Sequence, residues 1–354
     1  MSRLLVALVA LVISASVNAQ TCVNVLYGSL SGVAFGMDYY ETPFDPTHAP
    51  IIFWLYGNGW AGGPHRHCSV NVSGQAGSGV CDAFQWFLDH GFNIVAPDII
   101  GTGGGGHTFP QEAQDTKAAI GYLTHFINTL NNSCTMKGDI NDIRVWTFSS
   151  GGLEGLWMVV APNTKWSSDG NQNCTYCDTG YTITRMVCMS CPGGDLSLIY
   201  QNGDSNTQTA ISGLLGCAPS IGQTSCIATA QAASASLHIT VTPVPVLVIT
   251  GASDTTVYPT SQTATVTNLT NAGGTATQDT WTGQPHQLDF STNYNWPPTG
   301  LSTPLNSIPN GECYTTGGGV TPCGWAGNTI PAALLFLTQG VNRVPVSTGL
   351  GTIR

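Results

Sequence analysis

The chain reads Ile-Arg-Val-Trp-Thr-Phe-Ser-Ser-Gly-Gly over residues 143–152 and continues as the apolar segment Leu-Glu-Gly-Leu-Trp-Met-Val-Val over residues 153–160. The first five residues are typical of a buried strand, and residues 153–160 are typical of a helix. Two serines and two glycines lie between these segments. Small residues at this junction allow the chain to turn sharply from a strand into a helix.

A strand, a serine and a helix in this order form the layout of a nucleophile elbow, whose usual pattern is Gly-x-Ser-x-Gly. The tight turn requires small residues two positions before and two positions after the serine. Ser149 satisfies this requirement, because Thr147 and Gly151 flank it at these positions. With Ser150 as the central serine, the bulky Phe148 would lie in the turn. Ser149 is therefore the predicted nucleophile, and the helix behind it favours developing negative charge. The alternative is a serine-rich turn without chemistry, because Thr147 stands where glycine is usual.

Strands and helices alternate on both sides of this junction. The continuous apolar run over residues 50–56 predicts a strand that is buried on both faces, further short strands follow it, and the segments between the strands have helical patterns. The predicted strands cover residues 50–56, 92–97, 143–147 and 244–250, and the predicted helices cover residues 82–90, 110–130, 153–160 and 331–339. This alternation predicts an α/β fold with a mostly parallel central sheet and helices on both faces.

The alternation is lost between residues 161 and 240. This segment holds half of the 12 cysteines and many Asn, Ser, Thr and Gly residues. We expect it to be a cysteine-rich insertion, linked by disulfides, on a single catalytic domain that covers residues 20–354. A small second domain is the alternative, and the sequence does not decide between the two.

A nucleophilic serine needs a base and an acid that orients the base, and both follow further along the chain. Asp254 comes after a predicted strand and a glycine, at the sheet edge where α/β proteins build their sites. His286 lies in a short Gly-Gln-Pro-His loop. The order Ser149, Asp254, His286 is the one expected on this architecture, so we predict a catalytic triad. The rival acids Asp195 and Asp289 follow no predicted strand.

The segment Tyr-Gly-Asn-Gly-Trp, residues 56–60, follows the first predicted strand. Glycine lets the backbone of such a loop approach a substrate closely. We expect the backbone N–H groups of Asn58, Gly59 and Ser150 to form an oxyanion hole for developing negative charge. Trp60 is expected to line the substrate pocket, with packing in the core as its close alternative.

The first residues predict export from the cell. Met-Ser-Arg precedes an apolar run over residues 4–17, and Val-Asn-Ala at residues 17–19 has small residues at both positions that define a cleavage site. These features predict a signal peptide over residues 1–19. The apolar run is shorter than the about 20 residues that a membrane span needs. We therefore expect a secreted protein that does not associate with membranes once the signal is removed.

Composition agrees with export. Charged residues make up 8% of the chain, the net charge is −10 and no run of Lys and Arg occurs, so we expect no nucleic-acid partner. An even number of cysteines, 12, predicts disulfides in an oxidising compartment. Plausible local pairs are Cys68–Cys81, Cys217–Cys226 and Cys313–Cys323. Sequons compatible with a glycoprotein begin at Asn71, Asn131, Asn173 and Asn268.

Two patterns elsewhere in the chain are typical of bound ions or cofactors. Cys-x-x-Cys occurs at residues 174–177 and again at residues 188–191, the spacing of a zinc ribbon, but disulfides are favoured in an exported chain. Residues 101–106 satisfy Gly-x-Gly-x-x-Gly after a predicted strand, yet no helix opens there at once. We therefore expect neither a metal nor a cofactor.

Taken together, these motifs resemble the α/β-hydrolase-fold carboxylesterases, in particular the hormone-sensitive-lipase-like and feruloyl or acetyl-xylan esterase-like branch. The resemblance covers roughly residues 33–160 and 243–340, and it includes Phe-Gly-Met-Asp-Tyr-Tyr at residues 35–40 and the stretch 109–119. It implies hydrolysis of carboxylic esters through an acyl-enzyme. Ser149 would attack the ester, His286 would shuttle the proton, and Asp254 would orient His286.

Three residues depart from the pattern of this family. Tyr56 stands where the family has His, and Asn58 and Thr147 stand where it has Gly, which bears on the geometry of the loops and hence on the substrate. The expected substrates are short acyl, aryl or plant-polymer esters, such as feruloyl or acetyl esters. A polyester depolymerase or a serine peptidase with the same triad is the alternative within the class. A catalytically inactive, secreted binding module is the alternative outside it.

Overall fold

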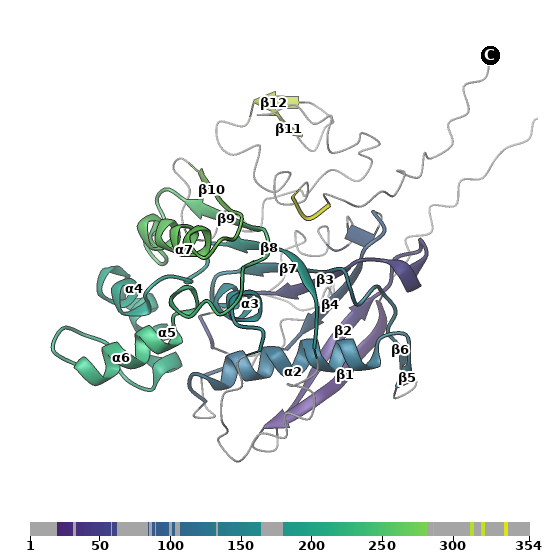
Figure 1. Ribbon diagram of the computed structural model, residues 1–354, viewed down its shortest axis with the longest axis horizontal. Coiled ribbons are helices and arrows are strands. Elements are labelled where there is room, and N and C mark those ends of the chain that lie inside the picture. Colours follow the sequence, from purple (N-terminus) through teal and green to yellow (C-terminus); the bar gives the residue numbers. More distant parts are fainter. Residues whose placement is uncertain are drawn as a thin grey trace, which may run out of the picture.

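The protein is built around a central β-sheet (Figure 1). Its structure is a computed structural model that describes residues 20–30, 33–57, 59–61, 84, 87–88, 90–98, 101–102, 107–131, 134–163, 180–281, 286, 312–314, 320–322 and 336–338. In these ranges the sheet has eight strands in the order β1-β2-β4-β3-β7-β8-β9-β10. The pairs β1–β2 and β2–β4 are antiparallel, and every other neighbouring pair is parallel. The predicted α/β fold with a mostly parallel sheet is confirmed.

The strands of this sheet are β1 (Gln20–Leu30), β2 (Val33–Tyr40), β3 (Ile51–Leu55), β4 (Asn93–Pro97), β7 (Ile143–Phe148), β8 (Ile183–Met189), β9 (Val246–Gly251) and β10 (Ala276–Trp281). Two small hairpins pair β5 (Leu130–Asn131) with β6 (Cys134–Thr135) and β11 (Glu312–Tyr314) with β12 (Val320–Pro322). The helices are α2 (Gln111–Phe126), α3 (Ser150–Val160), α4 (Leu196–Asn202), α5 (Ser205–Leu215), α6 (Thr224–Ala233) and α7 (Pro259–Asn271), with short 3-10 turns at Pro46–His48 and Ala235–Leu237.

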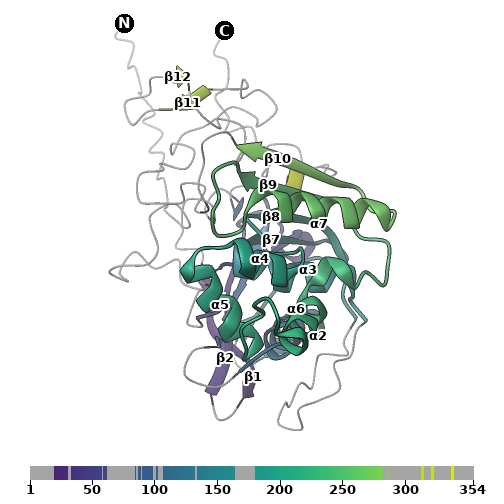
Figure 2. The same ribbon diagram turned by 90° about the vertical axis from the view of Figure 1, so that its left-hand side faces the viewer.

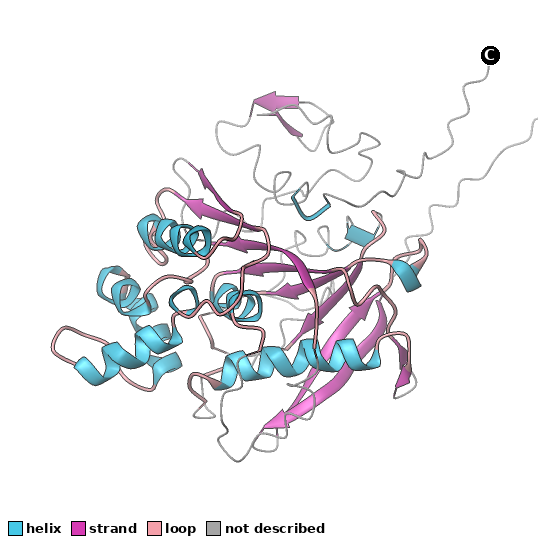
Figure 3. Ribbon diagram, in the orientation of Figure 1, coloured by secondary structure: helices cyan, strands magenta, loops and turns pink. Residues whose placement is uncertain are grey.

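Strands β3, β4, β7 and β9 are buried on both faces. Successive side chains of β3 alternate between two hydrophobic clusters, with Phe53 in the first and Trp54 in the second. Helices α2, α3 and α7 contribute to the first cluster and cover one face of the sheet (Figure 3). Each fully buried aliphatic or aromatic side chain contributes about 1.5–3 kcal/mol relative to exposure. Burial of both faces of the sheet therefore stabilises the position of the strands whose ends carry the candidate site.

The other face of the sheet is covered by helical residues from two distant parts of the chain. Phe84, Phe87 and Leu88 are helical and buried in the second cluster, and Leu337 joins them from the helical turn at residues 336–338. Most of the helices predicted at residues 82–90 and 331–339 lies outside the described residues, as does the predicted signal peptide. The described residues of both segments are helical and pack on the second face of the sheet, as predicted.

The structure corrects the prediction for residues 161–240, where no strand was expected. Strand β8 lies in this stretch and pairs with β7 on one side and β9 on the other. Its apolar pattern is interrupted by Arg185, and two cysteines at its end draw attention to a disulfide rather than to a strand. Helices α4, α5 and α6 follow and group together beside the sheet (Figure 2). Whether they count as an insertion or a second domain stays a prediction.

Disulfides link cysteines in the part of the chain that the structure describes. The pairs there are Cys22–Cys134, Cys188–Cys191 and Cys217–Cys226. The predicted pair Cys217–Cys226 is confirmed, and the Cys188–Cys191 bond replaces the zinc alternative for that motif. The other predicted pairs each include a residue outside the described ranges.

Helices long and apolar enough to cross a membrane are absent from the described ranges. In the same ranges, no group of three or more His, Cys, Asp or Glu side chains is arranged to hold a metal ion.

Candidate active site

The sharp turn between β7 and α3 places Ser149 at the carboxyl end of a central strand. Its backbone has φ 51° and ψ −127°, a conformation that non-glycine residues rarely adopt. A strained backbone at this point is characteristic of the nucleophile elbow, where the turn presents the serine side chain above the sheet. The N–H of Ser149 donates to the carbonyl of Met189 at 2.9 Å, which fixes the turn to β8.

Close packing around the turn explains the two glycines that follow the serine. A Cβ atom on Gly151 would lie 2.6 Å from the carbonyl oxygen of Leu55, at the end of β3. A Cβ atom on Gly152 would lie 2.1 Å from Cys191 Sγ. Both distances are far shorter than any side chain tolerates, so only glycine allows α3 to start this close to the sheet.

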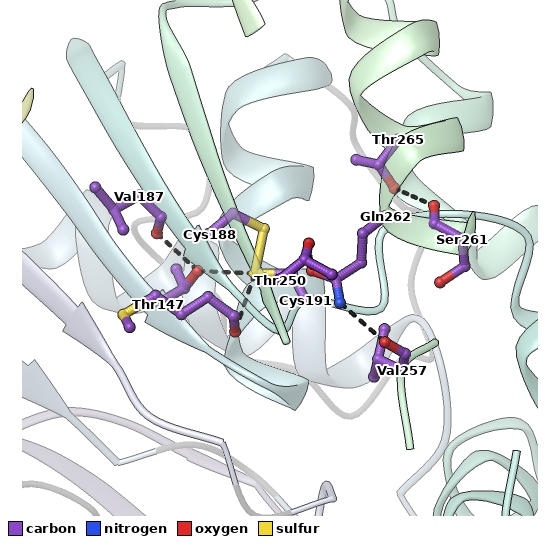
Figure 4. Close-up of a disulfide and its surroundings, with 10 residues drawn as sticks. Thr147, Val187, Cys188, Cys191, Thr250, Val257, Ser261, Gln262 and Thr265 are labelled. Carbon is purple, nitrogen blue, oxygen red and sulfur yellow. Dashed lines mark hydrogen bonds between the residues drawn. A yellow bond between two sulfur atoms is a disulfide. The ribbon is translucent and has the colours of Figure 1, made fainter. Parts of the chain in front are cut away.

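Thr147 stands where the elbow pattern has glycine, and two neighbours accommodate it. Its side chain is buried, its hydroxyl donates to the carbonyl of Val187 at 3.0 Å, and Oγ1 lies 3.3 Å from Cys191 Sγ (Figure 4). Across from it, a Cβ atom on Gly155 would lie 2.5 Å from Thr147 Cγ2. The absent side chain of Gly155 thus provides the space that the larger elbow residue occupies.

Of the three residues predicted as a triad, His286 lies within hydrogen-bond distance of both Ser149 and Asp254. Ser149 Oγ is 2.8 Å from His286 Nε2. On the other side of the ring, His286 Nδ1 is 2.9 Å from one carboxylate oxygen of Asp254 and 3.2 Å from the other. The Asp254 side chain is fully buried, whereas the His286 side chain is 15% exposed. A buried carboxylate behind a partly exposed imidazole is the arrangement in which the imidazole can accept a proton from the serine.

Asp254 is held in place by the turn that follows β9. Its Oδ1 atom accepts hydrogen bonds from the backbone N–H groups of Thr256 and Val257, at 2.9 and 2.8 Å. These bonds leave Oδ2 directed at His286. The rival acid Asp195 has a different task, because it accepts the N–H of Ser197 at 2.8 Å and so caps helix α4. The other rival, residue 289, lies outside the described ranges.

The predicted oxyanion loop approaches the elbow closely. A Cβ atom on Gly57 would lie 2.3 Å from the Phe148 carbonyl oxygen and 2.7 Å from the Ser150 nitrogen. The N–H of Gly59 donates to Ser150 Oγ at 3.1 Å, so in this structure it is engaged with a hydroxyl group rather than free to bind an oxyanion. Residue 58 lies outside the described ranges. The Ser150 hydroxyl, next to the nucleophile in the chain, therefore holds the loop of residues 57–60 against the elbow.

Trp60 packs in the hydrophobic core, which is the alternative that the sequence left open, and its role in binding substrate stays a prediction. Its side chain is 4% exposed and belongs to the main hydrophobic cluster. The indole N–H donates to Glu154 Oε1 at 2.8 Å. The backbone of Trp60 has a φ of 58°, which accompanies this inward orientation of the side chain. Its acceptor Glu154 lies one turn into α3, and nothing in the sequence indicates that the two residues are partners.

Three acidic side chains lie close together behind this tryptophan, and sequence reasoning missed them. Glu112 and Asp115 come from α2, Glu154 comes from α3, and each is less than a tenth exposed. Burial, and the charge of neighbouring carboxyl groups to a smaller degree, raises the pKa of Glu154 to about 8 and that of Glu112 to about 8. The hydrogen bond from Trp60 opposes this rise in pKa for Glu154. Both carboxyl groups are therefore expected to be neutral in the folded protein at neutral pH.

These raised pKa values predict that the protein becomes less stable as the pH rises from 5 to 8. The unfolded chain releases these protons near its ordinary pKa, whereas the folded chain retains them, so each carboxyl removes up to about 1.4 kcal/mol per pH unit in this window. Glu154→Gln keeps the acceptor for Trp60 but cannot ionise. We expect it to match the wild type near pH 5 and to be more stable near pH 8, in denaturant unfolding followed at both pH values.

The matched control for this prediction is Glu41→Gln. Glu41 is a partly exposed glutamate that pairs with Lys137 at 3.0 Å and is not a member of the buried acidic cluster. Its variant should keep the wild-type slope of stability against pH. An unchanged slope in Glu154→Gln would contradict the neutral state of the buried carboxyl.

The fold and the site together define a class. A mostly parallel sheet carries a serine, an acid and a histidine in this order, hydrogen-bonded in series, which is the arrangement of the α/β-hydrolases. A family model narrows the class, because the BD-FAE model matches residues 37–269. The chain belongs to the BD-FAE family, an esterase family of the α/β-hydrolase fold.

Solved structures with the same fold are esterases. A thermophilic esterase from the planctomycete Thermogutta terrifontis aligns with a TM-score of 0.54 at 15% identity, over 76% of this chain and 84% of its own. The same enzyme phosphorylated by paraoxon aligns with a TM-score of 0.53 at 15% identity, over 77% and 89%. A truncated carbohydrate esterase from gut microbiota aligns with a TM-score of 0.55 at 21% identity, over 76% and 90%. No curated protein sequence matches the chain.

Proposed function

We propose that this chain is a secreted serine esterase that hydrolyses carboxylic esters through an acyl-enzyme. The observation that supports this most directly is the series of hydrogen bonds that joins Ser149 Oγ, His286 and the buried Asp254. The match to an esterase family supports the same chemistry. Export is proposed from the signal peptide predicted over residues 1–19 and from the disulfides of the described chain.

In the proposed reaction, Ser149 Oγ attacks the acyl carbon while His286 Nε2 accepts its proton. The imidazolium formed in this step is stabilised by the Asp254 carboxylate at Nδ1. His286 then donates the proton to the oxygen of the leaving alcohol, the ester bond breaks and an acyl-serine remains. Water, deprotonated by His286, attacks the acyl-serine and releases the carboxylic acid, which restores Ser149.

Backbone N–H groups near the elbow would stabilise the oxyanion of the tetrahedral intermediate. The N–H of Ser150 at the start of α3 is the first candidate, since the helix N-terminus also favours negative charge. The loop of residues 57–60 would supply the second donor, and for Gly59 this requires the Ser150 hydroxyl to release its N–H. The contact between Gly59 and Ser150 would then be one that changes when substrate binds.

Within this chemistry we propose short acyl, aryl or plant-polymer esters as substrates. A carbohydrate esterase among the solved structures of similar fold supports carbohydrate esters as substrates. Acetyl and feruloyl esters are the examples that the sequence resemblance predicts. The proposed substrates are uncharged at the ester, and the site needs no ion to polarise them because backbone donors and the histidine serve that purpose. A polyester or a peptide would use the same three residues, so the substrate panel below includes both.

The experiment combines turnover with covalent labelling of the full-length, secreted protein. A panel of p-nitrophenyl acetate, p-nitrophenyl butyrate, a long-chain ester, methyl ferulate, acetylated xylan, a polyester film and a chromogenic peptide measures the preference. A fluorophosphonate probe followed by peptide mapping identifies the reactive residue, which we expect to be Ser149. Neither turnover nor labelling, in protein shown to be folded by circular dichroism, would favour the inactive binding module. Labelling together with cleavage of the peptide alone would make the protein a peptidase.

A further inference from the structure

A four-residue ring closes the carboxyl end of β8, next to the elbow. The disulfide between Cys188 and Cys191 joins the ends of the segment Cys-Met-Ser-Cys, and it is drawn beside Thr147 in Figure 4. Cys188 and Ser190 are fully buried, and Cys191 is 1% exposed. The ring thus lies inside the protein, against the start of α3, where Gly152 has no side chain because Cys191 Sγ fills that space.

Backbone and side-chain groups of this ring contact all three segments that carry the proposed triad. The carbonyl of Met189 accepts the N–H of Ser149 at 2.9 Å. The N–H of Ser190 donates to the carbonyl of Ile249 at 2.8 Å, near the end of the strand that leads to the acid. The hydroxyl of Ser190 donates to the backbone carbonyl of His286 at 3.0 Å. One short ring therefore connects the nucleophile, the acid strand and the base.

Ser190 has an unusual backbone conformation within this ring. Its backbone φ is 49°. This value lies in the left-handed region, which is unfavourable for a non-glycine residue and persists only where the surroundings fix it. The disulfide fixes the two ends of the ring, and the bond to Ile249 fixes its middle, so the Ser190 side chain is directed at the histidine backbone.

The short ring contributes little to the stability of the whole fold. Stabilisation by a disulfide increases with the length of the chain it closes. Cys188 and Cys191 are separated by 3 positions, whereas Cys22 and Cys134 are separated by 112. A bond that constrains so few residues, placed beside the nucleophile, has mainly a local effect.

We propose that Ser190, held by the Cys188–Cys191 ring, is a positioning residue that sets His286 against Ser149. The inference rests on the proposed function, because it assumes that His286 is the base. Ser190 touches the histidine backbone rather than a reacting atom, so it acts on the reaction only through the place of the imidazole. The ring acts through Ser190.

The first test replaces Ser190 with alanine and, in parallel, with glycine. Both variants lose the hydroxyl, whereas glycine alone relieves the left-handed backbone. We expect kcat for p-nitrophenyl acetate to fall about 10- to 100-fold in both, since small displacements of a catalytic group have effects of this size. KM should change by less than about threefold, because ground-state binding does not use the imidazole. The rate of fluorophosphonate labelling should fall with kcat.

Ser234→Ala is the matched control for the hydroxyl. Ser234 is also fully buried, and its hydroxyl donates to the carbonyl of Ala230 at 2.7 Å rather than to the histidine backbone. It should lower the melting temperature without changing kcat. If Ser190→Ala also melts earlier but keeps the wild-type kcat, Ser190 is merely structural and the proposal is overturned.

The second test opens the ring in the double variant Cys188→Ala/Cys191→Ala, with Cys217→Ala/Cys226→Ala as the matched control. The ring variant should lose kcat to the same degree as Ser190→Ala, and the control should keep it. Adding Ser190→Ala to the opened ring should cause little further loss, since residues that act as one unit are not additive. Wild-type kcat in the opened ring would overturn the role of the disulfide, and fully multiplicative losses would overturn the coupling.

These outcomes are separable from a failure of the proposed function. If Ser149→Ala keeps full activity, the proposed nucleophile is wrong whatever the ring variants do. If Ser149→Ala is inactive and Ser190→Ala equals the wild type, the esterase chemistry stands and the positioning role falls.

Discussion

Replacing Ser149 with alanine should lower kcat for p-nitrophenyl acetate by at least about 10⁴-fold, because removal of the nucleophile of a triad leaves only the contribution of binding and of the oxyanion donors. The variant should fold normally, since its Cβ atom and the turn remain. Initial rates at saturating substrate measure kcat, and the fluorophosphonate probe should no longer label the protein.

Ser150→Ala is the control that separates the two neighbouring serines. Ser150 Oγ accepts the N–H of Gly59 at 3.1 Å but is not the hydroxyl that contacts His286. We expect its variant to retain most of the wild-type rate and to remain labelled at Ser149. Full activity in Ser149→Ala together with loss of activity in Ser150→Ala would transfer the role to the second serine.

Asp254→Asn should lower kcat by about 10⁴-fold with little change in the fold, as expected when the histidine is held in the wrong tautomer. The structure gives the reason. Oδ1 accepts two backbone N–H groups, from Thr256 and Val257, so the amide oxygen of the asparagine will take that position. Its NH₂ group is then directed at His286 Nδ1 and requires an acceptor there. The proton moves to Nε2, which can no longer accept the proton of Ser149.

Measurement of kcat across the pH range, with circular dichroism for folding, checks this second prediction. Asp195→Asn is the matched control, because Asp195 is the rival acid and caps α4 instead. It should leave kcat unchanged and lower the stability by about 1 kcal/mol or less, as a weakened helix cap does. Activity of Asp254→Asn close to that of the wild type would show that the histidine is oriented by another group.

The part of the fold that the sequence predicts is the part whose strands are buried on both faces. Residues 51–55 are a continuous apolar run, residues 143–148 are apolar except for Arg144 and Thr147, and both segments form central strands. Strand β7 also contains an arginine but was predicted because the Ser-Ser-Gly-Gly turn follows it, whereas the cysteines in and around β8 directed the prediction to a disulfide-linked insertion. The position of β8 between β7 and β9 is set by the neighbouring strands. Register and neighbours, which depend on the whole sheet, do not appear in a local pattern.

The candidate triad could be predicted because each member occupies a recognisable junction. The residues that support the triad could not be predicted, because they do not lie at such junctions. Ser190 and Glu154 are an ordinary serine and an ordinary glutamate in sequence, and only their buried partners, the His286 carbonyl and the Trp60 indole, give them a specific place. The packing of Trp60 in the core could not be predicted for the same reason, since its acceptor lies 94 positions away in the chain.

The burial of Cys188 and Cys191 has a practical consequence for how the protein is prepared. Thiol–disulfide exchange needs a thiolate to reach a sulfur atom, and neither residue is accessible from solvent in the folded chain. A reducing agent added to an assay therefore does not reach this disulfide in the folded protein. A chain that is synthesised in the cytosol of an expression host, in contrast, folds with both cysteines as thiols. The cellular compartment of synthesis, rather than the buffer of the measurement, decides whether this bond is present.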